Sequence, residues 1–206
     1  MVLFMGTLAF QAQAFDVNEN HTGIYVYGMG GMQTATDDTN DRTGTKFGNS
    51  VEPGFGLTVG GNITDWIASE MQFSYVTATG NTPSGQGREH LLTVRLNAKY
   101  SFLTNASMNK DAGWKIYPYA KMGGLAHGLY VNAPVVDDKV GAWGAGFGIG
   151  GGLEADYKAL YLGLDLSNDF VFLQGQNRTI GGVDTEILSG GFAYQFAAMA
   201  AVGVHF

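Results

Sequence analysis

Six charged residues stand at alternate, polar positions in segments whose other positions are largely apolar. In a β-strand alternate side chains share one face, so these charges are expected on the face opposite the apolar one. If those faces line the inside of a closed barrel, the charges are buried and must be paired and hydrogen-bonded. We therefore predict an ion-pair network that plugs the lumen. Its members are Glu70, Arg95, Lys99, Lys121, Glu154 and Asp165.

The heights of these residues along their strands predict which of them meet. Counting from the short connections places Glu70 near Lys99, and it places Arg95 and Lys121 higher, near Asp165. Such a network can stabilise a barrel without transport, or it can form part of an ion pathway. We favour the stabilising role. If replacing Arg95 by Ala changed neither stability nor conductance, the network hypothesis would fail.

No motif in the sequence predicts catalysis, a cofactor or a metal. The chain has no Cys, and no two of its four histidines (His21, His90, His127 and His205) are close in sequence. No local motif for a Ser–His–acid triad is present. Residues 37–42, DDTNDR, lack the Gly and Glu that a calcium loop requires. The glycine-rich segment 144–152 is expected inside a strand, where it cannot act as a phosphate-binding loop.

The composition indicates interleaved apolar and polar residues. Of 206 residues, 32 are Gly, and only 14% are charged although the hydrophobic set reaches 45%. A mean hydropathy of +0.01 then implies that apolar residues alternate with polar ones. The net charge of −7 disfavours nucleic-acid binding, which needs a basic surface.

The first fourteen residues, MVLFMGTLAFQAQA, resemble a secretory signal peptide. An apolar run is followed by the small residues Ala12 and Ala14 of a cleavage site, which predicts a mature domain at 15–206. The usual basic start is missing, so a translation start further upstream is one alternative. An N-terminal strand or buried helix is another. Beyond this segment no run has the ~18 apolar residues of a spanning helix.

Period-two alternation predicts eight strands. Residues 91–102 show it most clearly, with Leu92, Val94 and Leu96 on one face and Arg95, Asn97 and Lys99 on the other. The first strand leaves its parity open, because Tyr25-Val26-Tyr27 suits either face. The predicted strands are 23–34, 53–63, 67–75, 91–102, 114–130, 143–155, 160–170 and 194–206.

The size of the polar faces decides which face points inward. Gly144, Gly146, Gly148 and Gly150 follow one another on a polar face, as a narrow lumen requires. The apolar faces end in aromatic residues, a feature of membrane interfaces. We therefore predict an all-β, eight-stranded antiparallel up-and-down transmembrane barrel, with a soluble lipocalin-like barrel as the alternative. Short connections are expected on one side, apart from a longer polar turn at 103–113, and long ones at 35–52, 76–90, 131–141 and 173–188 on the other.

Several motifs support a family resemblance. The tail FAAMAAVGVHF, ending at Phe206, resembles the C-terminal assembly signal of bacterial outer-membrane proteins. NAKYSF with YPYAKMGG, and GAGFGIGGGLEADY with LYLGLDL, are similar to hairpins of small eight-stranded barrels. This family includes the OmpA-type transmembrane domain, the opacity-type surface antigens and porin-like outer-membrane proteins. The resemblance implies an outer-membrane location, contact with membrane lipids and lipopolysaccharide, and insertion by the barrel-assembly machinery.

The expected function is a non-enzymatic structural or adhesin-like role, exerted through extracellular loops that could bind a host or surface ligand. The protein is expected to be a monomer. A narrow channel is the main alternative. A lipid A-modifying barrel enzyme is disfavoured, because His127-Gly128-Leu129 lacks the serine of a His-x-Ser pair. A soluble carrier would instead remain in the aqueous fraction without detergent.

Overall fold

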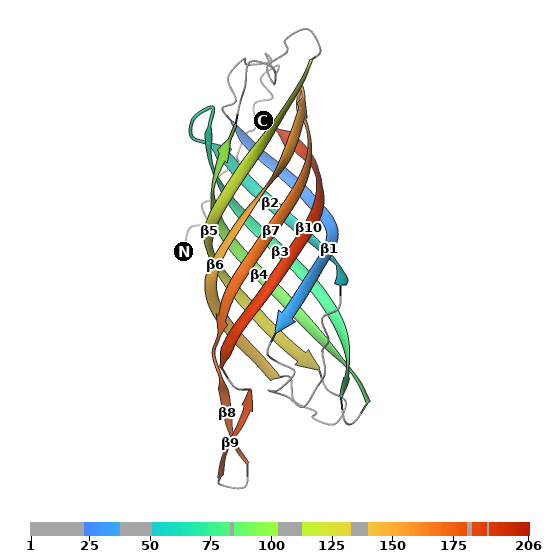
Figure 1. Cartoon of the computed structure of the whole chain (residues 1–206), viewed down its shortest axis with the longest axis vertical. Helices are drawn as coiled ribbons and strands as arrows, with labels where there is room; N and C mark the ends of the chain where they lie inside the picture. The colour runs from blue at the N-terminus through green and yellow to red at the C-terminus, as the bar shows by residue number, and fades with distance from the viewer. Residues whose placement is uncertain are drawn as a thin grey trace, which may run out of the picture.

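The strands of this protein form a barrel with one projecting hairpin (Figure 1). The computed structural model describes residues 23–37, 51–82, 85–102, 113–132, 140–180, 183–188 and 190–206. No helix in these ranges is long and apolar enough to cross a membrane. The strands are β1 (Ile24–Asp37), β2 (Val51–Asn62), β3 (Ile67–Thr82), β4 (Gly85–Ser101), β5 (Trp114–Asn132), β6 (Val140–Tyr157), β7 (Leu160–Leu173), β8 (Gln176–Ile180), β9 (Val183–Leu188) and β10 (Gly191–His205).

Eight of these strands close into an antiparallel barrel in the order β1-β10-β7-β6-β5-β4-β3-β2. Each barrel strand therefore pairs with the barrel strand that follows it in the chain. β8 and β9, which lie between β7 and β10 in sequence, form a separate sheet. The first and last strands complete the ring, in a register that runs from Tyr25 opposite His205 to Asp37 opposite Ala193. This closure confirms the predicted eight-stranded up-and-down barrel.

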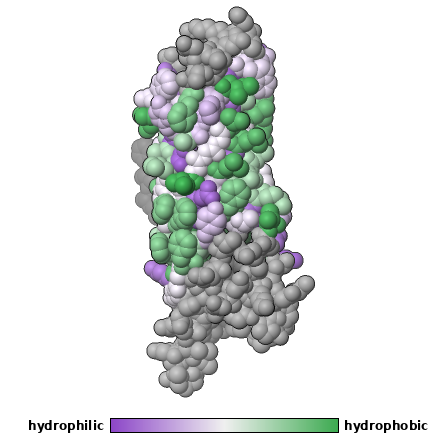
Figure 2. Space-filling model, viewed as in Figure 1, coloured by the Kyte–Doolittle hydropathy of each residue, from purple (hydrophilic) through white to green (hydrophobic). Residues whose placement is uncertain are grey.

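The apolar face of each barrel strand points outward. On β2, Phe55, Leu57 and Val59 are exposed, whereas Thr58 between them is buried. On β4, Arg95 is buried and Leu96 is 59% exposed. Figure 2 shows the apolar side chains spread over the outer surface between the ends of the barrel. A soluble protein of this size rarely exposes so much contiguous apolar surface, so the inverted faces indicate a barrel surrounded by lipid.

Aromatic side chains gather on the outer face near both ends of the barrel. We call the end with connections 63–66 and 158–159 the turn end, and the end from which β8–β9 projects the hairpin end. Trp66 contacts Tyr100 at the turn end, and Tyr130 contacts Trp143 at the hairpin end, with ring centroids 6.3 and 6.1 Å apart. Two aromatic belts of this kind mark the interfaces of a membrane barrel.

The connections differ in part from those predicted. The expected long loop at 76–90 is wrong, because β3 and β4 remain paired from Val76 opposite Leu91 to Thr82 opposite Gly85. The sequence of 76–90 predicts a loop because apolar and polar residues do not alternate along most of it. Backbone hydrogen bonds between strands do not require such alternation. The neighbouring predicted loops, 35–52 and 131–141, are also shorter, since their flanking strands extend to 37, 51, 132 and 140.

The expected loop at 173–188 contains a second sheet. β8 pairs with β9 from Ile180 opposite Val183 to Gln176 opposite Leu188, with an irregularity after Gln176. Glycines 181 and 182 separate the paired ends in sequence, a common dipeptide for a two-residue hairpin turn. In Figure 1 this hairpin extends the barrel beyond β7 and β10.

Two connections at the turn end, 63–66 and 158–159, are short, as predicted, and residues 103–112 of the third lie outside the described residues. Between β2 and β3, the Thr64 hydroxyl accepts a hydrogen bond from the backbone N–H of Ile67 at 3.1 Å. Between β6 and β7, Lys158 adopts a left-handed conformation with φ of 55°. Phe206 lies at this end, and its backbone N–H donates to the Ile24 carbonyl at 2.8 Å. The predicted signal peptide, Ala12 and Ala14 lie outside the described residues.

Small inward-facing residues make room for large side chains in the lumen. A Cβ added at Gly60 on β2 would lie 2.3 Å from the Tyr25 ring, whereas one added at Gly28 on β1 would meet nothing within 4 Å. Gly28 is exposed on the outer face. The two glycines therefore differ in the space around them although both lie inside strands.

We expect Gly60→Val to destabilise the barrel by about 1–3 kcal/mol, because the added side chain displaces a buried ring. Gly28→Val is the matched control and should leave stability within about 0.5 kcal/mol or increase it. Urea unfolding of both variants in lipid vesicles measures the difference. Equal stability of the two variants would contradict the tight packing of the lumen.

Candidate functional site in the barrel lumen

All six charged residues predicted for the network face the lumen and are buried. They come from five consecutive strands, so closing the barrel brings together residues that are up to 95 positions apart (70 to 165). β3 supplies Glu70, β4 supplies Arg95 and Lys99, β5 supplies Lys121, β6 supplies Glu154 and β7 supplies Asp165.

Lys99 lies between two carboxylates. Its Nζ is 3.3 Å from Glu70 Oε1 and forms a second, closer ion pair with Glu154. The Tyr25 hydroxyl donates to Glu70 at 2.7 Å, and the Tyr161 hydroxyl donates to Glu154. Each carboxylate therefore has a charged partner and a hydroxyl donor, which compensates its removal from water.

Aromatic rings also surround the Lys99 ammonium. Its Nζ lies 4.8, 5.0 and 5.8 Å from the ring centroids of Tyr25, Tyr119 and Tyr161. These distances fall within the range of cation–π attraction, which strengthens where water is excluded. Tyr25 and Tyr161 thus hold the ammonium with their rings and its carboxylate partners with their hydroxyls, whereas Tyr119 contributes its ring alone to this pair.

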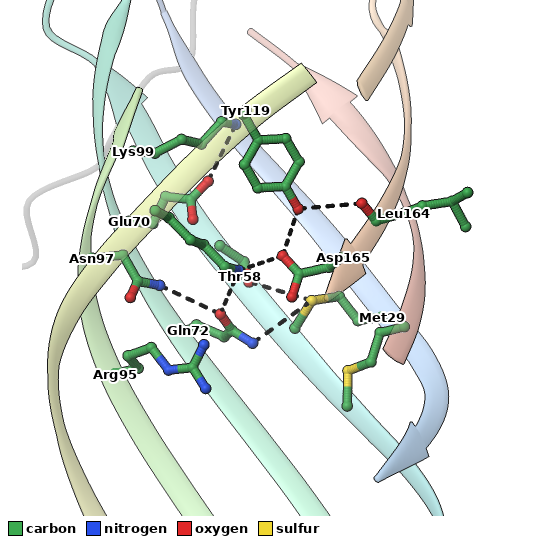
Figure 3. Close-up of polar contacts among 12 residues, drawn as sticks. Met29, Thr58, Glu70, Gln72, Arg95, Asn97, Lys99, Tyr119, Leu164 and Asp165 are labelled. Carbon is green, nitrogen blue, oxygen red and sulfur yellow. Dashed lines mark hydrogen bonds and ion pairs between the residues drawn. The ribbon is translucent and has the colours of Figure 1, made fainter. Parts of the chain in front are cut away.

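A second pair lies beside the first. Lys121 forms an ion pair with Asp165, and its Nζ donates to Gln72 Oε1 at 3.0 Å. The Tyr119 hydroxyl donates to Asp165 Oδ2 at 2.5 Å. Figure 3 shows Tyr119 and Asp165 pointing toward each other across the lumen. Because Lys121 and Lys99 are directly opposite in the β4–β5 register, the carboxylates also offset a repulsion between like charges.

Arg95 pairs with a residue that the predicted network omits. Its guanidinium forms an ion pair with Asp169 on β7, four residues further along that strand than Asp165. The expected proximity of Arg95 to Asp165 is corrected accordingly, and the stagger between tilted strands accounts for the shift. A Cβ at Gly148 would lie 2.5 Å from Asp169 Oδ1 and 3.1 Å from Arg95 Nε, so this glycine makes room for the pair.

Sequence reasoning also missed the tyrosines of the network. The rings of Tyr25 and Tyr27 stack with their centroids 5.8 Å apart, and those of Tyr27 and Tyr161 stack with their centroids 4.5 Å apart. Near the turn end, His205 Nε2 lies 3.3 Å from Asp156 Oδ1. The sequence Tyr25-Val26-Tyr27 suits either face, but the register of β1 turns both tyrosines inward. Met29 and Gln33, at the same alternate positions of this strand, also face inward. No other feature of the sequence distinguishes the inward face of β1 from its outward face.

The hairpin half of the lumen contains a cluster of apolar side chains. Seven buried residues form one cluster there, which we call the apolar layer. The layer was not predicted, because its members lie in runs such as Phe170-Val171-Phe172-Leu173 that are apolar on both faces. It consists of Val76, Leu91, Leu125, Leu129, Val171, Leu173 and Ala193.

The three described histidines lie in separate parts of the barrel. His127 lies in the lumen beside Thr93, His90 bonds Tyr75 on the outer face, and His205 lies near the turn end. Within the described residues no three His, Cys, Asp or Glu side chains are grouped to hold a metal ion. His21 and residues 38–42 of the acidic segment lie outside the described residues.

The fold and its lumen define a class of protein, the small transmembrane β-barrel of bacterial outer membranes. The family model described as "Outer membrane protein beta-barrel domain" matches residues 1–196. The chain belongs to this family, and its location is the bacterial outer membrane. A comparison with curated proteins finds no match.

Solved structures show the same fold. The crystal structure of Neisserial surface protein A (NspA) has a TM-score of 0.62 and 14% identity, covering 90% of this chain and 98% of that one. Ail, the attachment invasion locus protein of Yersinia pestis, in complex with the heparin analogue sucrose octasulfate, has a TM-score of 0.53 and 9% identity, covering 90% of this chain and 99% of that one. At such identities the similarity concerns the fold alone.

We expect Lys99→Gln to destabilise the barrel by about 3–5 kcal/mol, because it leaves Glu70 and Glu154 buried without their shared cation. Lys158→Gln, in the exposed turn, is the matched control and should change stability by no more than about 0.5 kcal/mol. Urea unfolding in lipid vesicles measures both.

The double variant Lys99→Gln with Glu154→Gln should recover part of the loss, since it removes one of the two stranded charges. Together with the single variant Glu154→Gln, these proteins form a double-mutant cycle. A coupling free energy above about 1 kcal/mol is expected for groups in direct contact. Additive effects would show that Lys99 and Glu154 do not interact in the folded barrel.

Proposed function

We propose that this protein is a closed, non-enzymatic barrel that reinforces the outer membrane and presents its hairpin-end connections to a partner outside the cell. The observation that carries the proposal is the filled lumen, in which paired charges occupy one half and the apolar layer the other. A filled barrel is a rigid scaffold, and loops on such a scaffold can bind a partner. The short-turn side is periplasmic in barrels of this class, so the hairpin end is expected to face outward.

The lumen chemistry also supports a protein without catalysis. One hydroxyl–imidazole contact in the described lumen joins Thr93 Oγ1 to His127 Nδ1, at 2.8 Å. Thr93 is 2% exposed, so a substrate has no route to its hydroxyl. Nucleophilic catalysis needs an accessible nucleophile in addition to its base.

A narrow channel remains the competing function, and single-channel conductance separates the two. We expect the folded barrel to be silent in planar bilayers near neutral pH, because ions would have to cross the buried apolar layer. An unboiled gel shift establishes that the inserted protein is folded. Stable, discrete openings of the wild-type protein at this pH would contradict the proposal.

Arg95→Ala extends this experiment to the network. We expect the variant to lose about 3–5 kcal/mol of stability, because Asp169 keeps a buried charge without its partner. It should stay silent while folded, since the apolar layer is unchanged. A variant with unaltered stability and conductance would show that the ion-pair network has no role in this barrel.

The charge of the connections bears on the class of surface partner. The structure of Ail holds a polysulfated heparin analogue. In this chain, segment 37–52 contains four acidic residues, Asp37, Asp38, Asp41 and Glu52, against Arg42 and Lys46, and the net charge is −7. Like charges repel at low ionic strength, so a polyanionic glycan is disfavoured as a partner.

We therefore expect the refolded barrel to pass through immobilised heparin without retention at low salt and in the presence of a chelator. Added Ca²⁺ tests whether cations bridge the acidic segment to the matrix, and the variant with Asp37, Asp38 and Asp41 changed to Asn is the control for such bridging. Retention without divalent cations would show that the partner class includes sulfated glycans.

A further inference from the structure

His127 is an ionisable group within the apolar layer. It lies on β5 between Leu125 and Leu129, two members of the layer, and is itself 2% exposed. Directly opposite on β6 is Gly144, where an added Cβ would lie 2.8 Å from Val171 and 2.9 Å from Leu173. The imidazole is therefore enclosed by the side chains that close the hairpin half of the lumen.

The imidazole has one polar partner among the described residues. Its Nδ1 lies 2.8 Å from the Thr93 hydroxyl, and its Nε2 has no hydrogen-bond partner. A neutral imidazole can satisfy Nδ1 through this hydroxyl in either tautomer. An imidazolium carries two N–H donors and a full charge, and one hydroxyl cannot compensate both.

No carboxylate in the part of the chain that the structure describes is a counter-ion for this imidazole. Among the described side chains, Arg95 on β4 and Asp169 on β7 are the charged ones next to this level, and they are paired with each other. The inward-facing residues of β3, β6 and β10 at this level are uncharged; they are Ser74, Val76, Ala142, Gly144, Ala193 and Gln195. Three further acidic residues lie on barrel strands that reach the hairpin end, Asp37 on β1, Glu52 on β2 and Glu89 on β4. Asp37 is directly opposite Ala193 in the β1–β10 register.

We propose that His127 is an acid-sensitive gate, whose protonation draws water into the apolar layer and opens the lumen to ions. This inference rests on the closed lumen of the proposed function. Water is the remaining source of hydrogen bonds for a buried imidazolium, because neither a carboxylate nor a second hydroxyl contacts it in the described lumen. Water that enters the layer joins the polar half of the lumen to the hairpin end, and an apolar constriction conducts once it is wetted.

The experiment records single channels from the full chain in planar bilayers at about pH 7 and at about pH 4.5, two units below the ordinary imidazole pKa of about 6.5. The variants are His127→Gln, which keeps a polar side chain without the titration, and His90→Gln, which removes a histidine from the outer face. We expect at least a tenfold rise in open events in acid for the wild type and for His90→Gln. His127→Gln should stay silent at both values.

The controls separate this inference from its alternatives. His127→Gln retains every lumen carboxylate, so an acid response equal to that of the wild type would assign the opening to those groups and overturn the inference. A wild-type barrel that is folded by gel shift yet silent in acid would also overturn it. Openings of the wild type near neutral pH would instead refute the closed barrel of the proposed function.

Leu129→Asn keeps the test decisive if His127→Gln does not fold. An amide in the layer supplies hydrogen-bonding groups for water without any titration. We expect this variant to open at least tenfold more often than the wild type near neutral pH. Silence of the folded variant at both pH values would show that the apolar layer is not the barrier.

Discussion

The fold depends on one constraint, which is that no backbone N–H or C=O group can remain unpaired in lipid. A sheet satisfies it only by closing on itself, and the pairing of β1 with β10 achieves this along thirteen residue pairs from Tyr25–His205 to Asp37–Ala193. Once the sheet is closed, each strand has one face toward lipid and one toward the lumen. The apolar face must point outward, and every charge on the other face is enclosed.

The lumen follows from that enclosure. Lys99, Lys121 and Arg95 face four carboxylates, those of Glu70, Glu154, Asp165 and Asp169. Tyrosine hydroxyls supply further donors to these carboxylates, so the network is more than a set of charge pairs. Removing one member leaves a stranded charge, whereas replacing a whole pair by apolar groups is often neutral. The network therefore specifies how the interior is filled, and inward-facing glycines such as Gly60 and Gly148 provide the space.

Much of this architecture could be predicted from the sequence, because the alternation is itself the consequence of the two environments. In strand 91–102, for example, the alternation alone predicts which side chains share the polar face, among them Arg95 and Lys99. Three features could not be predicted for physical reasons. The partner of Arg95 depends on the stagger between tilted strands, which single strands do not encode. The apolar layer lies where both faces are apolar. Strand pairing toward the hairpin end, as in residues 76–90 and in β8–β9, requires no alternation.

The central claim is that the lumen charges are paired and shielded from water. Solution NMR of the folded barrel with ¹⁵N-labelled lysine side chains tests it most directly, through the rate at which each ammonium exchanges protons with water. We expect slow exchange for the buried Lys99 and Lys121 and fast exchange for Lys158 in its exposed turn. Fast exchange of all three ammonium groups would show an open, hydrated lumen and would contradict the account.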